Sequence, residues 1–447
     1  MEKNNNISFN AQFDRKLIGR KGKSVRYLVI EVHAPDKTID RPSNPKPLNL
    51  AVVIDASGSM QGPRLAAARD AAIGVVRSLS DHDILSVISF SDDVITHVEC
   101  LPCNEDVRQE AILQIGQLTS RHTTNLAAGW LQGSECVAKG IDKGQDLQHR
   151  VILLSDGYAN QGITEPAQLG SFAQELRERG IFSTTVGIGD DYSPEQIQAI
   201  ADFGGGRMHD AERPEEIIEV LLAELRELFL TTAENVIVEA AFPPGVSIKN
   251  LNGYPASVEA NRIGCALGSL SEGALRRVVF RIRTPEGQEG DTLTFQIKIK
   301  WRRPGSNKAE ETSQISLVLT LARGRYNSIQ PRNMLLSQYV AEVWQSQIIK
   351  EVVQLNRQGR YDKAADYILR KMKFFQRYCQ DLPEGTRLIG ELERTAQRIT
   401  RPMQERSRKE IHLAHYKQSR NEMDHRTNVR RPRWDNYLKD DPKDTNN

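Results

Sequence analysis

Residues 48–60, LNLAVVIDASGSM, decide the fold. The first half is a nearly continuous apolar run that ends at Asp55, as expected of a strand buried on both faces of a sheet. The second half is a polar turn in which Gly58 lets the backbone bend tightly. Residues 64–79 follow, rich in alanine and with apolar residues at helical spacing. This order predicts the first strand, turn and helix of an α/β unit.

The alternation of strand and helix continues to about residue 230. Further strands are expected at 84–90, 150–156 and 181–189, with helices over 165–180 and 214–230. Such alternation predicts a mostly parallel sheet with helices on both faces.

The segments on either side of this unit have a different texture. Residues 235–321 contain β-rich stretches separated by Gly, Pro and Asn turns, which favour a β-sandwich, and residues 23–34 look like another strand of the same kind. From about Pro331 the apolar spacing becomes helical. We therefore expect an N-terminal β segment of the sandwich (1–48), an α/β unit inserted in that sandwich (49–230), the rest of the sandwich (231–325), a helical region (326–415) and a polar basic tail (416–447).

The charge is divided unevenly along the chain. The 447 residues contain 60 Lys and Arg against 58 Asp and Glu, a net of +2. Residues 49–230 hold 13 basic and 28 acidic residues, a net of −15, whereas 1–48 carry +5 and 231–447 carry +12. The acidic unit should attract cations and disfavour other anions at long range.

Other features of the composition bear on the compartment. No apolar run approaches the ~18 residues of a membrane-spanning helix, and the first residues, MEKNNNISFNAQF, lack the apolar core of a secretion signal. Five cysteines are too few for a disulfide scaffold of this length. We expect a cytoplasmic protein with reduced thiols.

One constellation of polar residues points to a metal site. Asp55, Ser57 and Ser59 follow the first core strand, Thr124 lies at a loop-to-helix junction, and Asp156 ends another strand. In a parallel sheet these positions meet at the carboxyl edge, where ligands bind. Hydroxyl and carboxylate oxygens suit Mg²⁺, Mn²⁺ or Ca²⁺ rather than zinc. Because hydroxyl ligands add no negative charge, the ion would favour one more carboxylate, which a partner protein can supply.

These motifs resemble a known family. VVIDASGSM (52–60), TTNLAAGW (123–130), LLSDGYANQG (153–162) and the framework at 186–217 are similar to the von Willebrand factor A (VWA) domain with a metal-ion-dependent adhesion site. The family pattern has Gly-Gly before the threonine, whereas His122-Thr123 stands here, so Thr123 competes with Thr124 for the role. The spacing to the following Asn-Leu favours Thr124.

The resemblance implies a Rossmann-like fold and protein binding that depends on Mg²⁺ or Mn²⁺, without catalysis. The order of the segments resembles bacterial cytosolic members, which resemble scaffold or co-factor subunits that work with ATPases, kinases or phosphatases. Our leading hypothesis is therefore a non-enzymatic, metal-dependent scaffold or adaptor that captures a partner's Asp or Glu in an intracellular complex.

An alternative function rests on the basic C-terminal part. Residues 323–447 carry 26 basic and 16 acidic residues, and Arg430, Arg431 and Arg433 stand beside Trp434. Such a segment can bind nucleic acid, or it can fold back on the acidic unit. A hydrolase is the third hypothesis, but the chain has no G-x-S-x-G elbow.

Two further pairs of residues have ordinary explanations. Cys100 and Cys103 form a single C-x-x-C pair, which we interpret as two reduced cysteines in a loop after an edge strand. His412 and His415 are three residues apart on an expected helix without a Glu or Cys partner. We interpret them as a solvated helix face rather than a zinc site.

Overall fold

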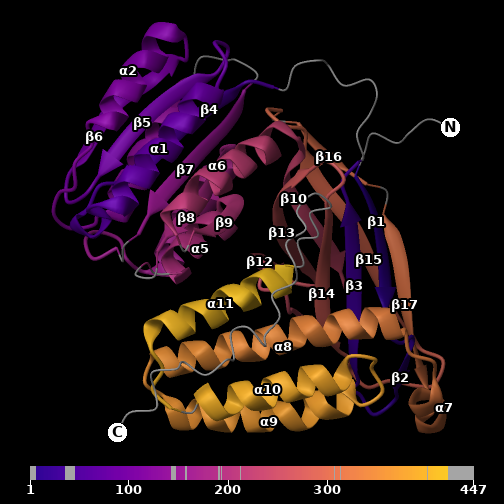
Figure 1. The fold of residues 1–447 in the computed structure, drawn as a ribbon. Helices are drawn as coiled ribbons and strands as arrows, with labels where there is room; N and C mark the ends of the chain where they lie inside the picture. The colour runs from indigo at the N-terminus through magenta and orange to yellow at the C-terminus, as the bar shows by residue number, and fades with distance from the viewer. Residues whose placement is uncertain are drawn as a thin grey trace, which may run out of the picture.

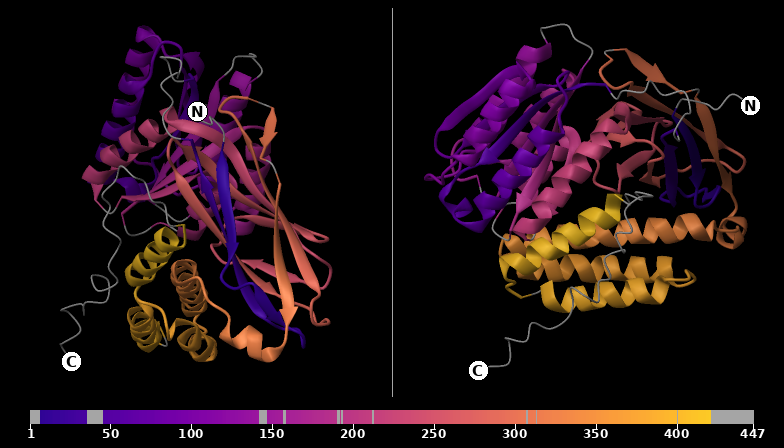
Figure 2. Two further views of the ribbon diagram at one scale, coloured as in Figure 1. Left: turned by 90° about the vertical axis from the view of Figure 1, so that its right-hand side faces the viewer. Right: turned by 45° about the horizontal axis from the view of Figure 1, so that its top comes forward.

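The computed structural model describes residues 7–35, 46–141, 147–156, 159–189, 192, 194–211, 213–306, 308–312, 314–399 and 401–420. It has three parts: an α/β unit, a pair of packed β-sheets, and a layer of helices that lies below both (Figure 1). The two further views show the same arrangement, with the helices α8–α11 on one side of the sheets and of the α/β unit (Figure 2).

The α/β unit is built on a six-stranded sheet with the order β6-β5-β4-β7-β8-β9. All neighbours are parallel except β5 and β6, which form an antiparallel pair at one edge. Every residue of β4, β5 and β8 is buried, because helices cover both faces of these strands. The strands are β4 (Leu48–Asp55), β5 (Ile84–Phe90), β6 (Val94–Pro102), β7 (Gln148–Ser155), β8 (Ile181–Ile188) and β9 (Gly205–Ala211).

Alternate side chains of β4 enter two different apolar cores. Leu50 and Val52 pack in the core that α1, α2 and α6 cover, whereas Ala51 and Val53 pack in the core under α3, α4 and α5. This two-residue alternation is what a strand between two helical layers requires, and it confirms the predicted Rossmann-like fold. The helices are α1 (Pro63–Ser78), α2 (Glu105–Gly116), α3 (Leu126–Ile141), α4 (Pro166–Glu178), α5 (Pro194–Phe203) and α6 (Pro214–Phe229), with the 3₁₀ turn η1 (Gly58–Met60) before α1.

Two more sheets enclose a separate core. One has the order β1-β3-β14-β11 and the other β12-β13-β10-β15-β17-β2, with β16 beside β15. Leu28 of β3 and Val278 of β14 share a core with Val238 of β10 and Phe295 of β15. The strands are β1 (Ser8–Phe13), β2 (Leu17–Gly19), β3 (Val25–His33), β10 (Thr231–Ala241), β11 (Ser247–Asn250), β12 (Ala256–Glu259), β13 (Arg262–Ser271), β14 (Leu275–Arg283), β15 (Thr292–Arg302), β16 (Ala309–Glu311) and β17 (Ile315–Ala322).

The pairing of β3 joins segments that lie on either side of the α/β unit in the sequence. This strand precedes the α/β unit in the sequence, yet it pairs antiparallel with β14, which follows that unit. In the sequence, the α/β unit therefore lies between strands that pair with each other in one sheet.

The C-terminal region is helical, as expected. Tyr27 and Val29 on the outer face of β3 pack against α8 residues such as Val340, and the Tyr27 ring lies 6.0 Å from the Trp344 ring. Helix α11 lies between α8 and the α/β unit, and none of the described helices is long and apolar enough to cross a membrane. The helices are α7 (Gly324–Ile329), α8 (Met334–Arg357), α9 (Tyr361–Cys379), α10 (Gly385–Ile399) and α11 (Glu405–Arg420).

Some details differ from the sequence-based expectations. His412 and His415 are only 5% and 3% exposed, because α11 is covered on that face, so the prediction of a solvated helix face is wrong. Cys100 lies within β6 rather than in a loop, and both it and Cys103 are buried cysteines outside any disulfide. Helix α11 continues to Arg420, past the expected boundary at 415. The residues 430–434 lie outside the described part of the chain.

Candidate metal centre

The polar turn after β4 brings Asp55, Ser57 and Ser59 together. The Ser57 backbone N–H donates to Asp55 Oδ1 at 2.9 Å, which is the local bond that an aspartate forms in a turn of this kind. The Ser57 and Ser59 hydroxyl oxygens lie 3.0 Å apart. A side chain at Gly58 would place Cβ 3.2 Å from the Arg121 carbonyl oxygen, so glycine permits the close approach of the neighbouring loop.

Asp156 reaches the same place from the end of β7. Ser59 Oγ donates to Asp156 Oδ1 at 2.7 Å, across 97 positions of sequence. Ser155 Oγ donates to Asp55 Oδ2 at 2.6 Å, which joins the ends of the neighbouring strands β4 and β7. The structure therefore brings together four of the five residues that the sequence predicted.

Thr124 is held in the loop that closes this edge. The Gly58 N–H donates to the His122 carbonyl at 2.9 Å, which fixes the loop against the first turn. The Thr124 carbonyl accepts from the Asn160 N–H at 3.2 Å, and its own N–H donates to Asn160 Oδ1 at 3.1 Å. These bonds connect Thr124 to the segment that follows Asp156. Thr124 is 4% exposed, whereas Thr123 is exposed.

The two carboxylates are fully buried and repel each other. The pKa of Asp55 is raised to about 6, mainly by burial and to a lesser extent by the charge of Asp156, while hydrogen bonds from Ser155 and Ser57 oppose this rise. Ser59 is exposed. The site thus combines buried negative charge with an opening to solvent.

Arg64 is a member of the site that the sequence reasoning missed. Its guanidinium donates to Asp156 Oδ2 at 2.9 Å from the first turn of α1. A cation is unfavourable at a helix N-terminus, where the helix dipole is positive. A basic residue directly after Pro63 therefore signals a nearby carboxylate, and that signal could have identified Arg64.

The donor atoms fit a hard divalent cation. Carboxylate and hydroxyl oxygens are the ligands that Mg²⁺ and Ca²⁺ prefer. The described residues contain no group of three or more His, Cys, Asp and Glu side chains that could hold a metal ion. The candidate site has only two carboxylates, and its other donor atoms are hydroxyl oxygens.

Comparisons with known proteins agree with this fold. Residues 49–221 match the family model of the von Willebrand factor type A domain. The uncharacterized protein YfbK of Escherichia coli K12 is 29% identical over 208 residues, which are 46% of this chain and 36% of that protein. Human inter-alpha-trypsin inhibitor heavy chain H3 is 32% identical over 127 residues, 28% of this chain and 14% of that protein. An uncharacterized Synechocystis protein is 31% identical over 219 residues, 48% of each chain, so the matches span about half of these relatives or less.

Solved structures resemble the chain beyond this domain. A von Willebrand factor type A protein from Catenulispora acidiphila aligns with a TM-score of 0.64 at 14% identity, over 87% of this chain and 89% of that one. The ArnB paralog VWA2 from Sulfolobus acidocaldarius aligns with a TM-score of 0.58 at 17% identity, over 93% and 98%. These likenesses concern the fold. Residues 49–221 thus match a von Willebrand factor type A domain, and the solved structures share the fold over most of the chain.

Proposed function

We propose that this protein is a metal-dependent interaction subunit, a scaffold or adaptor in an intracellular complex. A divalent cation, Mg²⁺ or alternatively Mn²⁺ or Ca²⁺, would be held by Asp55, Ser57, Ser59, Thr124 and Asp156, and would bind an Asp or Glu carboxylate of a partner protein. The observation that carries this proposal is the buried carboxylate pair joined to two serine hydroxyls at the carboxyl edge of the sheet.

The charges of the site support an open position for a partner. The three hydroxyl ligands add no negative charge, and the charge of Asp156 is already shared with Arg64. A bound cation would supply Lewis acidity, and a carboxylate from outside is the group that best completes its charge. We infer binding rather than catalysis, because in this proposal a partner carboxylate occupies the open position of the ion.

Calorimetry tests the metal site directly. Mg²⁺ titrated into the wild-type chain should release or absorb heat, and Asp55→Ala should abolish that signal. Asp70→Ala is the matched control, because this exposed aspartate lies on α1 away from the site. Equal heats in the wild type and Asp55→Ala would refute the assignment, once circular dichroism has shown that both are folded.

Affinity capture tests the role of the partner. Proteins recovered from source cells on the immobilised wild-type chain in Mg²⁺ should be lost in EDTA and on Asp55→Ala. The same proteins recovered under all three conditions would contradict metal-gated capture.

The nucleic-acid alternative has less support than this proposal. Among the basic residues of the C-terminal part, Lys409 and Arg420 are engaged within the chain, with Asp210 and Asp202 of the VWA domain. The arginines at 430, 431 and 433 and Trp434 lie outside the described residues.

A further inference from the structure

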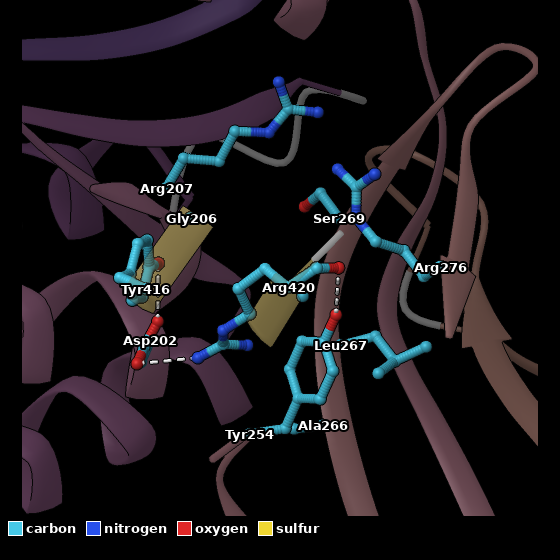
Figure 3. A pocket seen from close by; sticks show the side chains of 11 residues that line it. Asp202, Gly206, Arg207, Tyr254, Ala266, Leu267, Ser269, Arg276, Tyr416 and Arg420 are labelled. Carbon is cyan, nitrogen blue, oxygen red and sulfur yellow. Dashed lines mark hydrogen bonds and ion pairs between the residues drawn. The ribbon is translucent and has the colours of Figure 1, made fainter. Parts of the chain in front are cut away.

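Helix α11 docks on the VWA domain through buried charged groups. The basic helix faces acidic residues at the ends of α5 and β9, and the pairs are almost completely shielded from water. Figure 3 shows part of this junction, with Arg420 and Tyr416 both reaching Asp202 beside a small pocket. The contacts are Lys409 Nζ–Asp210 Oδ1 at 3.1 Å, Arg420 Nη2–Asp202 Oδ2 at 2.7 Å, Tyr416 Oη–Asp202 Oδ1 at 2.9 Å and His412 Nε2–Gln198 Oε1 at 2.7 Å.

Lys409 reaches the edge of the sheet that carries the metal site. Its Nζ donates to the carbonyl of Gly189, the residue directly after β8, and stands 4.2 Å from the centre of the Tyr192 ring. Only 3% of the Lys409 side chain is exposed. Because β4, β7 and β8 are parallel, Gly189 lies at the same edge as Asp55 and Asp156.

Gly189 in turn contacts Arg64. A Cβ atom at position 189 would stand 3.1 Å from three atoms of the Arg64 guanidinium group, so the guanidinium packs against the bare glycine backbone. Gly189 has φ +68°, and its N–H donates to Ala211 at 2.9 Å. Gly189 therefore contacts both Arg64 and Lys409.

Arg64 completes the connection to the site. The two oxygens of Asp156 are divided between Arg64 and Ser59, at 2.9 and 2.7 Å. The series Lys409, Gly189, Arg64, Asp156 is a continuous set of direct contacts from the C-terminal helix to a proposed metal ligand.

We propose that Arg64 and Lys409 are positioning residues that lower the cation affinity of the site while α11 is docked. The positive charge of Arg64 competes with the metal ion for Asp156. Lys409 holds Gly189 in contact with Arg64 through its bond to the Gly189 carbonyl. This inference rests on the proposed metal function. Because coupling between two binding events is reciprocal, a bound cation must weaken the docking of α11 by the same factor.

Calorimetry on the full chain tests the competition. Arg64→Met removes a positive charge a few ångströms from the site, so we expect Mg²⁺ to bind about tenfold more tightly or better. Lys409→Met should tighten binding by about fivefold, at the lower end of typical couplings. Arg77→Met and Lys417→Met are the controls, since they remove exposed charges from the same two helices and should leave the affinity unchanged.

A double variant controls for misfolding of Lys409→Met. Lys409→Met leaves Asp210 buried without this cation, so the double variant Lys409→Met, Asp210→Asn removes both charges and should show the same tightening. Unchanged or weaker Mg²⁺ binding by Arg64→Met, or unchanged binding by both Lys409 variants, would overturn the inference and leave the proposed function standing. Absence of Mg²⁺ binding by the wild type would overturn both.

Hydrogen exchange gives a readout that needs no partner. Amides of residues 405–420 should exchange faster in Mg²⁺ than in EDTA in the wild type. In EDTA alone, Arg64→Met should also speed their exchange, because Gly189 loses its support. Equal exchange in all these samples would contradict the link between the site and α11.

Discussion

The carboxyl edge of the VWA sheet and the contact of α11 with α5 and β9 both bury charged side chains, but they combine the charges differently. At the edge, two carboxylates repel each other and one arginine is present. Where α11 meets α5 and β9, Asp202 and Asp210 each face a cation. A site with excess buried charge of one sign favours a mobile ion of the other sign, whereas matched pairs hold two parts of a chain together.

The Arg420–Asp202 ion pair at the end of α11 gives the strongest test of this difference. Arg420→Met removes the partner of Asp202, and both side chains are only 7% exposed. Loss of one member of a buried pair costs ~3–5 kcal/mol, because the remaining charge is left in a poorly solvated place. Urea denaturation followed by circular dichroism should show this loss. Arg420→Met combined with Asp202→Leu should recover much of it, and a double variant as unstable as the single one would contradict the explanation.

The contrast also explains what the sequence could and could not predict. Asp55, Ser57 and Ser59 are fixed by a local turn after an apolar strand, so the pattern and the strand ends were enough to predict their place. The contact of α11 with the VWA domain joins residues more than 200 positions apart, such as Lys409 and Gly189, and no local pattern specifies such pairs. For His412 and His415, the spacing gave the shared helix face but not the layer that buries it.

The packing of α3 against the carboxyl end of β5 can be tested by substitution of a glycine. Gly129 packs so closely on β5 that a Cβ atom would lie 2.4 Å from the Phe90 ring. Gly129→Ala should therefore lower the free energy of unfolding by ~1–3 kcal/mol through overpacking. Gly74→Ala in α1 is the control, because nothing lies within 4 Å of the added methyl group and the change should stabilise the helix by up to ~1 kcal/mol. The same sign for both substitutions in thermal denaturation would refute this account of the packing.

Acid should weaken the α5–α11 contact. Burial, together with the charges of Lys350 and Arg357, lowers the pKa of His412 to about 3 from the 6.5 of the unfolded chain. The unfolded state therefore takes up the proton first, so the contribution to stability is complete above pH 6.5 and is lost as the pH falls toward 3. Each pH unit below 6.5 should cost ~1.4 kcal/mol for this residue.

A neutral replacement isolates that contribution. His412→Gln should reduce the difference between the unfolding free energies at pH 7 and pH 5.5, measured in urea. Burial also lowers the pKa of His415, so some pH dependence should remain in the single variant. An identical pH dependence in His412→Gln and the wild type would contradict the burial argument.

An exposed ion pair of the VWA domain should give the smallest effect. Lys139 Nζ lies 2.5 Å from Glu99, but the two side chains are 47% and 49% exposed. Water and side-chain entropy oppose such a pair, so Lys139→Ala should change the free energy of unfolding very little, and 1 M salt, with a Debye length of ~3 Å, should remove most of that change. The short distance alone would suggest a bond as strong as that of Arg420. Urea denaturation compares the two variants. If Lys139→Ala lowered the free energy of unfolding as much as Arg420→Met, the distance between the charges and not their burial would determine what an ion pair contributes. The explanation given for the difference between the two charged regions would then be wrong.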